Sequence, residues 1–245
     1  MTSTITGARG RLGRALSPLM AAQTPGRELL DITNRQMVEN YIRLHRPETF
    51  IHLAAYTSPA KCLMDKIGAW NTNVEGTRYI VHALEKYVPD CYFFLMSTPC
   101  IFNGEEETEH EENDFPDPEN FYGLVKAMQE MVVKESRLTW VIVRSNFVSR
   151  VKWEHPVAFS DRYSYYLFAD TLAEQIRNVI DKRMTGIVHI AGDTKMSMHE
   201  FALKCPDSQD VKPITLEEFY KGKPLPKLTK YMLLKSTTYP IIKFE

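Results

Sequence analysis

A phenol and an ammonium lie four residues apart in the segment FYGLVKAM, as Tyr122 and Lys126. Residues at this spacing share one face of a helix. A phenol with a pKa of about 10 is a weak acid at neutral pH, and a neighbouring ammonium lowers that pKa. We therefore interpret Tyr122 as a proton donor to a ketone oxygen whose carbon receives a hydride. The alternative is an ordinary surface pair.

Hydroxyl side chains precede this pair, at the end of an apolar run. The run YFFLM, residues 92–96, is followed by STPC, which contains Ser97 and Thr98. Ligands of open α/β sheets bind beyond the carboxyl ends of the strands. We therefore expect Thr98 to hydrogen-bond the same ketone oxygen as Tyr122.

A glycine-rich turn follows the first β-prone segment, residues 2–6. The stretch TGARGRLG places Gly7, Gly10 and Gly13 three residues apart at the start of a helical pattern. In this context the glycines allow a tight turn, a close approach to a pyrophosphate and close packing of the helix. The turn predicts dinucleotide binding, and Lys126 is then also expected to hold the nicotinamide ribose.

The choice of dinucleotide depends on the residues after the first helix. The segment QTPGRELLDITN is too short for a full second strand that ends in a ribose-binding acid. Asp31 within it is expected near the adenine. Arg9 and Arg11 lie in the phosphate turn, where a guanidinium pairs well with a 2′-phosphate. We therefore predict NADPH, with NADH as the alternative cofactor and a solvated turn as the alternative role of the arginines.

Strand and helix patterns alternate along the chain. This order predicts an α/β fold, a Rossmann-type doubly wound parallel sheet. We divide the chain into an NAD(P)-binding Rossmann domain, 1–150, and a small, shortened C-terminal substrate-binding cap, 151–245, with 167–192 returning to the Rossmann core. The expected strands are 2–6, 49–55, 91–97, 139–145 and 186–192, and the expected helices are 11–22, 38–45, 73–87, 122–136 and 169–183.

Composition narrows the functional classes. The chain has 245 residues and a net charge of −1, so no bulk charge favours nucleic acid or an anionic membrane. No apolar run approaches the ~18 residues of a membrane span, and the N-terminus lacks a signal pattern. The 4 cysteines and 7 histidines show no metal or disulfide spacing. We expect a cytoplasmic protein with free thiols and no metal. The acidic segment 104–120 is expected to be a solvated surface loop.

Several motifs together resemble a known family. TGARGRLG, HLAAYT, NVEGT, ST and YGLVK are similar to the extended short-chain dehydrogenase/reductases. LDIT, IFNG, DFPDP and TGIVHIAG resemble, within that superfamily, the dTDP-4-dehydrorhamnose reductase family. The resemblance implies NAD(P)H-dependent reduction of the 4-keto group of a nucleotide-linked 6-deoxyhexose, as in rhamnose biosynthesis. A nucleotide sugar is then the expected substrate, and a homodimer is one expected assembly.

The resemblance also assigns roles to residues. It places Asn73 in a supporting turn, where capping a helix is the alternative. Catalysis falls to Thr98, Tyr122 and Lys126, and substrate binding to Thr98, Pro99 and Phe147. The expected cofactor contacts are Gly7, Arg9, Gly10, Arg11, Leu12, Asp31, Ile32, Ala54, Ala55, Tyr56, Tyr122 and Lys126.

The sequence departs from the family pattern at Cys100 and near 150–158. STPC stands where the family has STDY, and about one helix length of the cap is missing. A cysteine at this position resembles bifunctional 3,5-epimerase/4-reductases acting on UDP- or GDP-sugars, with Lys152 or His155 as the second base. The alternative is that Cys100 fills space beside Pro99. Two further alternatives are a non-catalytic regulatory subunit and a 4,6-dehydratase or 4-epimerase with retained NAD.

Overall fold

A six-stranded parallel sheet forms the centre of the molecule. The computed structural model describes residues 2–221 and 226–244. The strand order β10-β5-β4-β3-β1-β2 and the parallel pairing confirm the predicted Rossmann-type sheet. In sheet order the strands are β10 (Gly186–His189), β5 (Thr139–Arg144), β4 (Tyr92–Ser97), β3 (Thr49–His52), β1 (Ser3–Thr6) and β2 (Ala22–Gln23).

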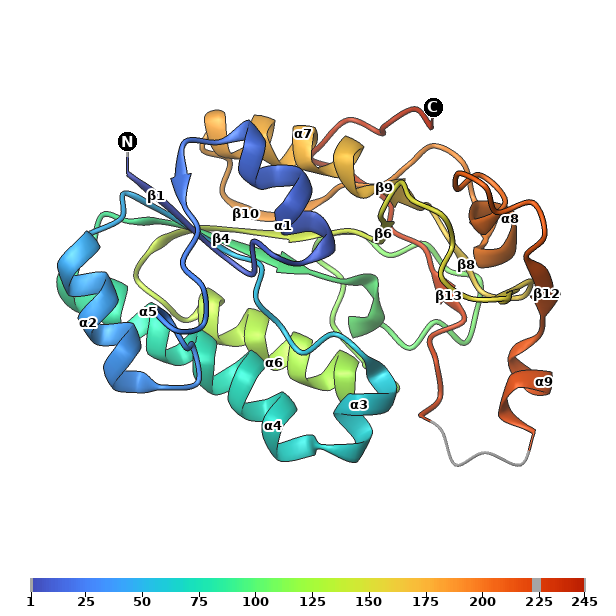
Figure 1. The fold of residues 1–245 in the computed structure, drawn as a ribbon, viewed down its shortest axis with the longest axis horizontal. Helices are drawn as coiled ribbons and strands as arrows, with labels where there is room; N and C mark the ends of the chain where they lie inside the picture. Colours follow the sequence, from blue (N-terminus) through green and yellow to red (C-terminus); the bar gives the residue numbers. More distant parts are fainter. Residues whose placement is uncertain (1, 222–225, 245) are drawn as a thin grey trace.

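Helices cover both faces of this sheet (Figure 1). One face carries α1 (Arg11–Leu16) and α7 (Ala169–Asp181), and the other carries α2 (Arg35–His45), α5 (Gly76–Tyr87) and α6 (Phe121–Lys134). Successive residues of a strand point to opposite faces. Phe94 accordingly packs in the cluster under α1 and α7, whereas Phe93 packs in the cluster under α2 and α5. Both phenylalanines are fully buried, as a doubly covered sheet requires.

The predicted shortness of the second strand is confirmed. β2 contains two residues only, Ala22 and Gln23. The chain then runs irregularly to Asn34, whose side chain accepts a hydrogen bond of 3.1 Å from the backbone N–H of Met37 and caps α2. The cap explains where α2 begins, because an Asn side chain satisfies one of the free N–H groups of a helix start.

Two short helices between β3 and α5 were not predicted. They are α3 (Pro59–Met64) and α4 (Lys66–Trp70), followed by a π-helical turn, Asn71–Glu75, that leads directly into α5. The side chain of Ser58 caps α3 and the side chain of Asp65 caps α4, each by accepting a hydrogen bond from a backbone N–H of its helix. Each helix is too short to show the 3.6-residue repeat on which a prediction depends.

Small sheets and short helices form the cap, at the right of Figure 1. Its elements are β7 (Val157–Phe159), β8 (Tyr163–Ser164), β11 (Met196–Ser197), α8 (Met198–Ala202), β12 (Lys212–Ile214), α9 (Leu216–Tyr220) and β13 (Tyr231–Met232). A two-stranded sheet of β6 (Phe147–Val148) and β9 (Leu167–Phe168) lies at the border between the main sheet and the cap. The end of the chain leaves the cap again, because Tyr239 and Ile242 pack against the main core cluster. The two-domain division remains a prediction.

The acidic segment 104–120 forms ion pairs and hydrogen bonds with the end of the chain. We call residues 226–239 the C-terminal strap. Lys227 of the strap lies 2.6 Å from Glu105, and Lys235 lies 2.7 Å from Glu111. The carboxylate of buried Glu112 accepts hydrogen bonds from the backbone N–H and hydroxyl of Thr237. The expectation of solvated charges is therefore wrong for the buried Glu112, whereas Glu105 and Glu111 form exposed ion pairs.

Candidate active site

The glycine turn adopts the shape that a phosphate cradle needs. Gly7 has a φ of +72°, and a Cβ on it would lie 2.6 Å from the backbone nitrogen of Ala54. A Cβ on Gly13 would lie 2.3 Å from the carbonyl oxygen of Gly7. Only glycine fits at these two positions, so the turn packs tightly between β1 and the chain after β3. Gly10 is exposed, and this leaves the outer side of the turn open to a ligand.

The predicted cofactor residues of this turn have different surroundings. Leu12 is 4 % exposed and packs in the main core cluster, so its side chain supports the helix. Arg9 and Arg11 are exposed. Arg9 lies 3.8 Å from Glu28, and Arg11 reaches across to Glu154 of the cap at 3.2 Å. The two guanidinium groups therefore point to opposite sides of the turn.

The residues expected near the adenosine lie after β2 and β3. Burial raises the pKa of Asp31, but hydrogen bonds from Thr33 and Arg27 outweigh burial and lower it. Ile32 is buried in the core cluster under α2 and α5, whereas Ala54, Ala55 and Tyr56 are half-buried.

Asn73 holds the loop that contains Tyr56. Its amide accepts from the backbone N–H of Tyr56 at 2.7 Å and donates to the carbonyl of Tyr56 at 3.1 Å. It lies in the π-helical turn before α5, and Glu75 is the N-cap residue of α5, so the capping alternative is wrong.

Thr98 and Tyr122 meet beyond the carboxyl end of β4. Thr98 directly follows the strand, and its hydroxyl accepts a hydrogen bond of 3.2 Å from the backbone N–H of Cys100. Tyr122 comes from the first turn of α6 and is hydrogen-bonded to Thr98. Asn120 caps α6 through the N–H of Gly123, which places Tyr122 at the very start of the helix.

The two titratable groups of α6 differ from expectation. Burial and the neighbouring Cys100 raise the pKa of Tyr122 above its ordinary value, although the bond from Thr98 opposes this. The buried Lys126 directs its ammonium to the carbonyl oxygen of Met96, at 2.8 Å, and to the amide oxygen of Gln129. The expected lowering of the Tyr122 pKa by Lys126 is therefore wrong. Burial lowers the pKa of Lys126 to about 8, and Glu130 opposes this decrease.

A cleft of about 470 Å³ opens over Thr98 and Tyr122, between the sheet and the cap. It brings together several predicted residues, which are Arg11, Thr98, Cys100, Tyr122, Phe147, Lys152 and His155. Pro99 does not line it in the part of the chain that the structure describes, because this residue is buried at the start of a 3₁₀ turn, Pro99–Ile101.

The cleft also contains residues that the sequence reasoning missed. Arg162 donates from Nε to the carbonyl of Thr229 at 2.9 Å, and its Nη2 lies 4.0 Å from the Cys100 sulfur. Asn146 and Trp153 complete the same wall. No motif marks these three positions. The only signal was their place in the predicted cap or at the end of the strand before it.

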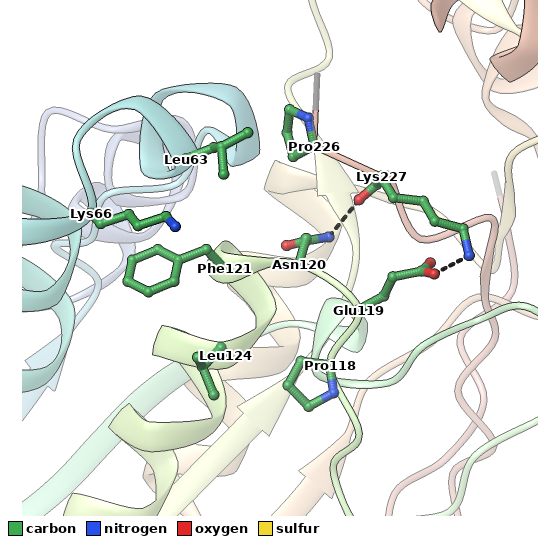
Figure 2. Close-up of a pocket in the computed structure, with 9 residues that line it drawn as sticks. All are labelled: Leu63, Lys66, Pro118, Glu119, Asn120, Phe121, Leu124, Pro226 and Lys227. Atoms are coloured by element: carbon green, nitrogen blue, oxygen red, sulfur yellow. Dashed lines mark hydrogen bonds and ion pairs between the residues drawn. The ribbon is translucent and has the colours of Figure 1, made fainter. Parts of the chain in front are cut away.

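A second pocket, of about 350 Å³, lies on the outer side of α6 (Figure 2). Phe121 lines this pocket while its neighbour Tyr122 lines the cleft, so α6 separates the two spaces. Lys227 pairs with Glu119 there, and its carbonyl accepts a hydrogen bond of 3.0 Å from Asn120. None of the described residues that line this pocket carries a hydroxyl group, in contrast to Thr98 and Tyr122 in the cleft.

Other kinds of site find no support in the described residues. The 4 cysteines are buried and unpaired, as predicted. No three His, Cys, Asp or Glu side chains among residues 2–221 and 226–244 are placed to hold a metal ion. No helix in these ranges has the length and apolar character to cross a membrane.

The parallel sheet, the glycine turn after β1 and the cleft over Thr98 and Tyr122 together define a class, the Rossmann-type proteins. Within this class, the chain belongs to the RmlD substrate binding domain family, whose model matches residues 1–238. The family resemblance noted in the sequence is thereby confirmed.

Named relatives agree with this assignment. A dTDP-4-dehydrorhamnose reductase of Aggregatibacter actinomycetemcomitans is 27 % identical over 225 residues, which cover 81 % of this chain and 76 % of the relative. The structure of dTDP-4-dehydrorhamnose reductase from Bacillus anthracis in complex with NADP has a TM-score of 0.86 at 25 % identity and covers 96 % of this chain and 90 % of that chain. A UDP-glucose 4-epimerase from Thermus thermophilus, in complex with NAD, has a TM-score of 0.78 at 19 % identity and covers 96 % of this chain and 91 % of that chain, a likeness of fold alone.

Proposed function

We propose that this protein is an NADPH-dependent reductase of the 4-keto group of a nucleotide-linked 4-keto-6-deoxyhexose. One observation carries the proposal: Thr98 and Tyr122 line the same cleft. This cleft lies beyond the carboxyl end of β4, the strand next to β3 in the sheet. The similar reductases named above support the substrate class.

The residues present suit a phosphorylated dinucleotide. Gly7 and Gly13 allow the turn to pack tightly against its own backbone, and the exposed Gly10 leaves the outer side of the turn open to a pyrophosphate. Arg9 is exposed on the side of the turn that faces Glu28, after the short second strand. It is our candidate for the 2′-phosphate, because a guanidinium binds phosphate through paired N–H groups. Arg11 lines the cleft, which supports a role on the substrate side.

The side chains divide the reaction between them. When bound, NADPH supplies the hydride that adds to C4 of the sugar. Thr98 and Tyr122 hold the ketone oxygen, and Tyr122 gives its proton to that oxygen, which leaves a secondary alcohol and NADP⁺. The raised pKa keeps Tyr122 protonated at neutral pH, as a donor requires. Lys126 stabilises the phenolate that forms and holds the nicotinamide ribose.

The test is a direct assay of the complete protein. Purified protein is mixed with NADPH and, in turn, dTDP-, UDP- and GDP-4-keto-6-deoxyhexoses, while the NADPH absorbance is followed. Products are identified by mass spectrometry and NMR. We expect oxidation of NADPH and a 4-hydroxy product with at least one nucleotide. A lack of turnover with every sugar at saturating NADPH would contradict the proposal and favour a regulatory subunit.

A second candidate function rests on the position of Cys100. Its thiol lines the cleft together with Tyr122, and Lys152 and His155 of the cap line the same cleft. A thiolate removes a proton from C3 or C5 because the C4 ketone acidifies both positions. Lys152 or His155 then returns a proton to the opposite face. This chemistry would make the protein a 3,5-epimerase/4-reductase.

The Cys100→Ala variant separates the two candidate functions. Epimerisation requires the thiol, whereas reduction of a ketone that is already epimerised does not. Solvent deuterium incorporation at C3 and C5 measures epimerisation, and NADPH oxidation measures reduction. Cys91→Ala is the control, because Cys91 is buried in the cluster under α2 and α5. Normal deuterium incorporation by Cys100→Ala would rule out this role.

A cytoplasmic location and a homodimer remain proposals that accompany this function. Both NADPH and nucleotide sugars are compounds of the cell interior, which supports the location. Exposed apolar side chains on α3 and α4, namely Met64 and Ile67, support an assembly. Light scattering of the purified protein and fractionation of cells test these two points.

A further inference from the structure

The ammonium of Lys126 has two protein partners that the family motif does not contain. It donates to the carbonyl of Met96, at 2.8 Å, and to the side-chain oxygen of Gln129. Lys126 is 3 % exposed and Gln129 is fully buried. An ammonium has three N–H donors, so these two contacts leave one N–H for a ligand or for Tyr122. The two partners therefore decide where the remaining N–H points.

A chain of buried hydrogen bonds holds the other end of Gln129. Its Nε2 lies 2.8 Å from the hydroxyl of Thr77, and this hydroxyl lies 2.7 Å from the carbonyl of Asn73. Nε2 of His52 lies 3.1 Å from the same hydroxyl, and Nδ1 of His52 lies 2.8 Å from the hydroxyl of Thr6. The chain thus runs from the end of β1, next to the glycine turn, to Lys126.

The hydrogen atoms of this chain have one consistent arrangement. The Thr77 hydroxyl has a single hydrogen, which it donates to Asn73, so its oxygen accepts from both Gln129 and His52. Burial and the Lys126 ammonium lower the pKa of His52 to about 3, so His52 is neutral and donates from Nε2. Thr6 then donates to Nδ1. The amide of Gln129 must turn its NH₂ to Thr77 and its oxygen to Lys126.

We propose that Gln129 is a positioning residue for the reduction proposed above, on which this inference rests. Its amide oxygen fixes the Lys126 ammonium against the end of β4, and the His52–Thr77 pair fixes the direction of the amide. A reversed amide would place two donors against each other at Lys126 and two acceptors against each other at Thr77. Gln129 is therefore an acceptor that the protein has oriented before any ligand binds.

The charged and titratable groups around Lys126 determine how a substitution of Gln129 changes the pKa of Lys126. Glu130 and Tyr122 lie on the same helix, His52 lies on β3, and Cys100 neighbours Tyr122. Loss of the amide oxygen removes one hydrogen bond that favours the charged ammonium. Burial then lowers the pKa of Lys126 without opposition from this bond. A carboxylate at the same position adds a negative charge beside the ammonium. The two changes therefore move the titration of Lys126 in opposite directions.

The experiment measures this titration in the cofactor-free protein. Lysine labelled with ¹⁵N gives a signal for each ammonium, and the signal of Lys126 is the one missing from Lys126→Arg. We expect Gln129→Met to shift the midpoint of the Lys126 titration downward by roughly one pH unit, the size of one lost hydrogen bond to a charged group. We expect Gln129→Glu to shift it upward. In the NADPH-coupled assay, the alkaline limb of the pH profile of kcat should move in the same directions.

A matched control is Gln175→Met on α7, on the other face of the sheet, where Gln175 accepts a hydrogen bond from Tyr239 at 3.1 Å. It should leave the Lys126 titration unchanged. Unchanged Lys126 midpoints in both Gln129 variants would overturn the proposal. If Gln129→Met does not fold, the test depends on Gln129→Glu alone. An upward shift of the Lys126 midpoint in that variant would support the proposal, because a loss of packing does not raise this midpoint. Shifted midpoints in a protein that reduces no sugar would refute the proposed reductase and still support the positioning of Lys126.

Discussion

The sheet and the cap of this protein are held together by different kinds of contact. The sheet joins long, fully buried strands such as β4, whose side chains fill an apolar cluster on each face. The cap joins strands of two or three residues, and the C-terminal strap is fastened to the acidic segment by side chains more than 100 positions apart in sequence, such as Lys235 and Glu111. The sheet supplies Thr98 and its helix α6 supplies Tyr122, whereas the cap supplies the outer wall of the cleft. The proposed chemistry and the proposed substrate choice thus depend on regions that are held together by different kinds of contact.

Removing the candidate proton donor should give the largest effect on activity. Tyr122→Phe keeps the ring that lines the cleft and removes the hydroxyl that protonates the ketone. We expect kcat to fall roughly a thousand-fold, the range of general acid catalysis, with NADPH affinity changed little. Stopped-flow absorbance and fluorescence titration measure the two quantities. Tyr41→Phe, on α2, is the control, and a kcat of Tyr122→Phe near that of the wild type would refute the assigned chemistry.

Breaking the buried ion pair between β5 and α6 should give the largest effect on stability. Arg144 and Glu130 are both fully buried, with Nη2 and Oε2 2.8 Å apart, and Ser97 donates to the same carboxylate at 2.6 Å. Arg144→Met leaves a carboxylate buried without its partner, which costs roughly 3–5 kcal/mol of unfolding free energy. Urea unfolding measures this cost. Adding Glu130→Gln should recover much of it, and a double variant no more stable than Arg144→Met would contradict the explanation.

The sequence predicted best the part of the site that depends on local spacing. Gly7, Thr98, Tyr122 and Lys126 belong to short motifs at strand or helix ends, and the structure brings their elements together at one edge of the sheet. The direction of the Tyr122 pKa shift could not be predicted from the sequence, because this pKa depends on burial by residues from several segments.

Other parts of the site depend on partners that are distant in sequence. Arg162 lies in a segment without periodicity, and its contacts with Thr229 and Cys100 span more than 60 residues. The acidic segment 104–120 has the composition of a solvated loop, and only the position of the C-terminal strap shows that its charges are paired. Gln129 is recognisable as a position on the buried face of α6, but its orientation depends on Thr77 and His52.

In the acidic segment, Glu112 should make stability depend on pH. Burial raises the pKa of Glu112, but hydrogen bonds from Thr237 outweigh burial and lower the pKa to about 2. A lowered folded-state pKa contributes stability above the ordinary value of 4.5, and this contribution is lost as the pH falls from 4.5 toward 2. We expect Glu112→Gln to be less stable than the wild type at pH 7 by roughly 1–3 kcal/mol. The difference should shrink in acid.

Urea unfolding at several pH values tests this dependence. Other carboxylates titrate in both proteins, so the difference between wild type and variant isolates Glu112. Glu106→Gln, an exposed position of the same segment, should change neither stability nor its pH dependence. A constant difference between wild type and Glu112→Gln from pH 7 to pH 3 would show that the Glu112 carboxylate is not the cause.

The smallest effect is expected at the exposed pair of the strap, and it tests whether the cap is stabilised by many weak contacts. Lys235 and Glu111 are 54 % and 47 % exposed, so water screens their attraction. Lys235→Ala should lower the unfolding free energy by less than about 1 kcal/mol, with the loss disappearing in molar salt. Because the strap contributes Leu228 and Met232 to the cleft, the same variant should raise KM for the sugar nucleotide more than it lowers kcat. A lower kcat at unchanged KM would show that the strap acts on the chemistry and not on binding.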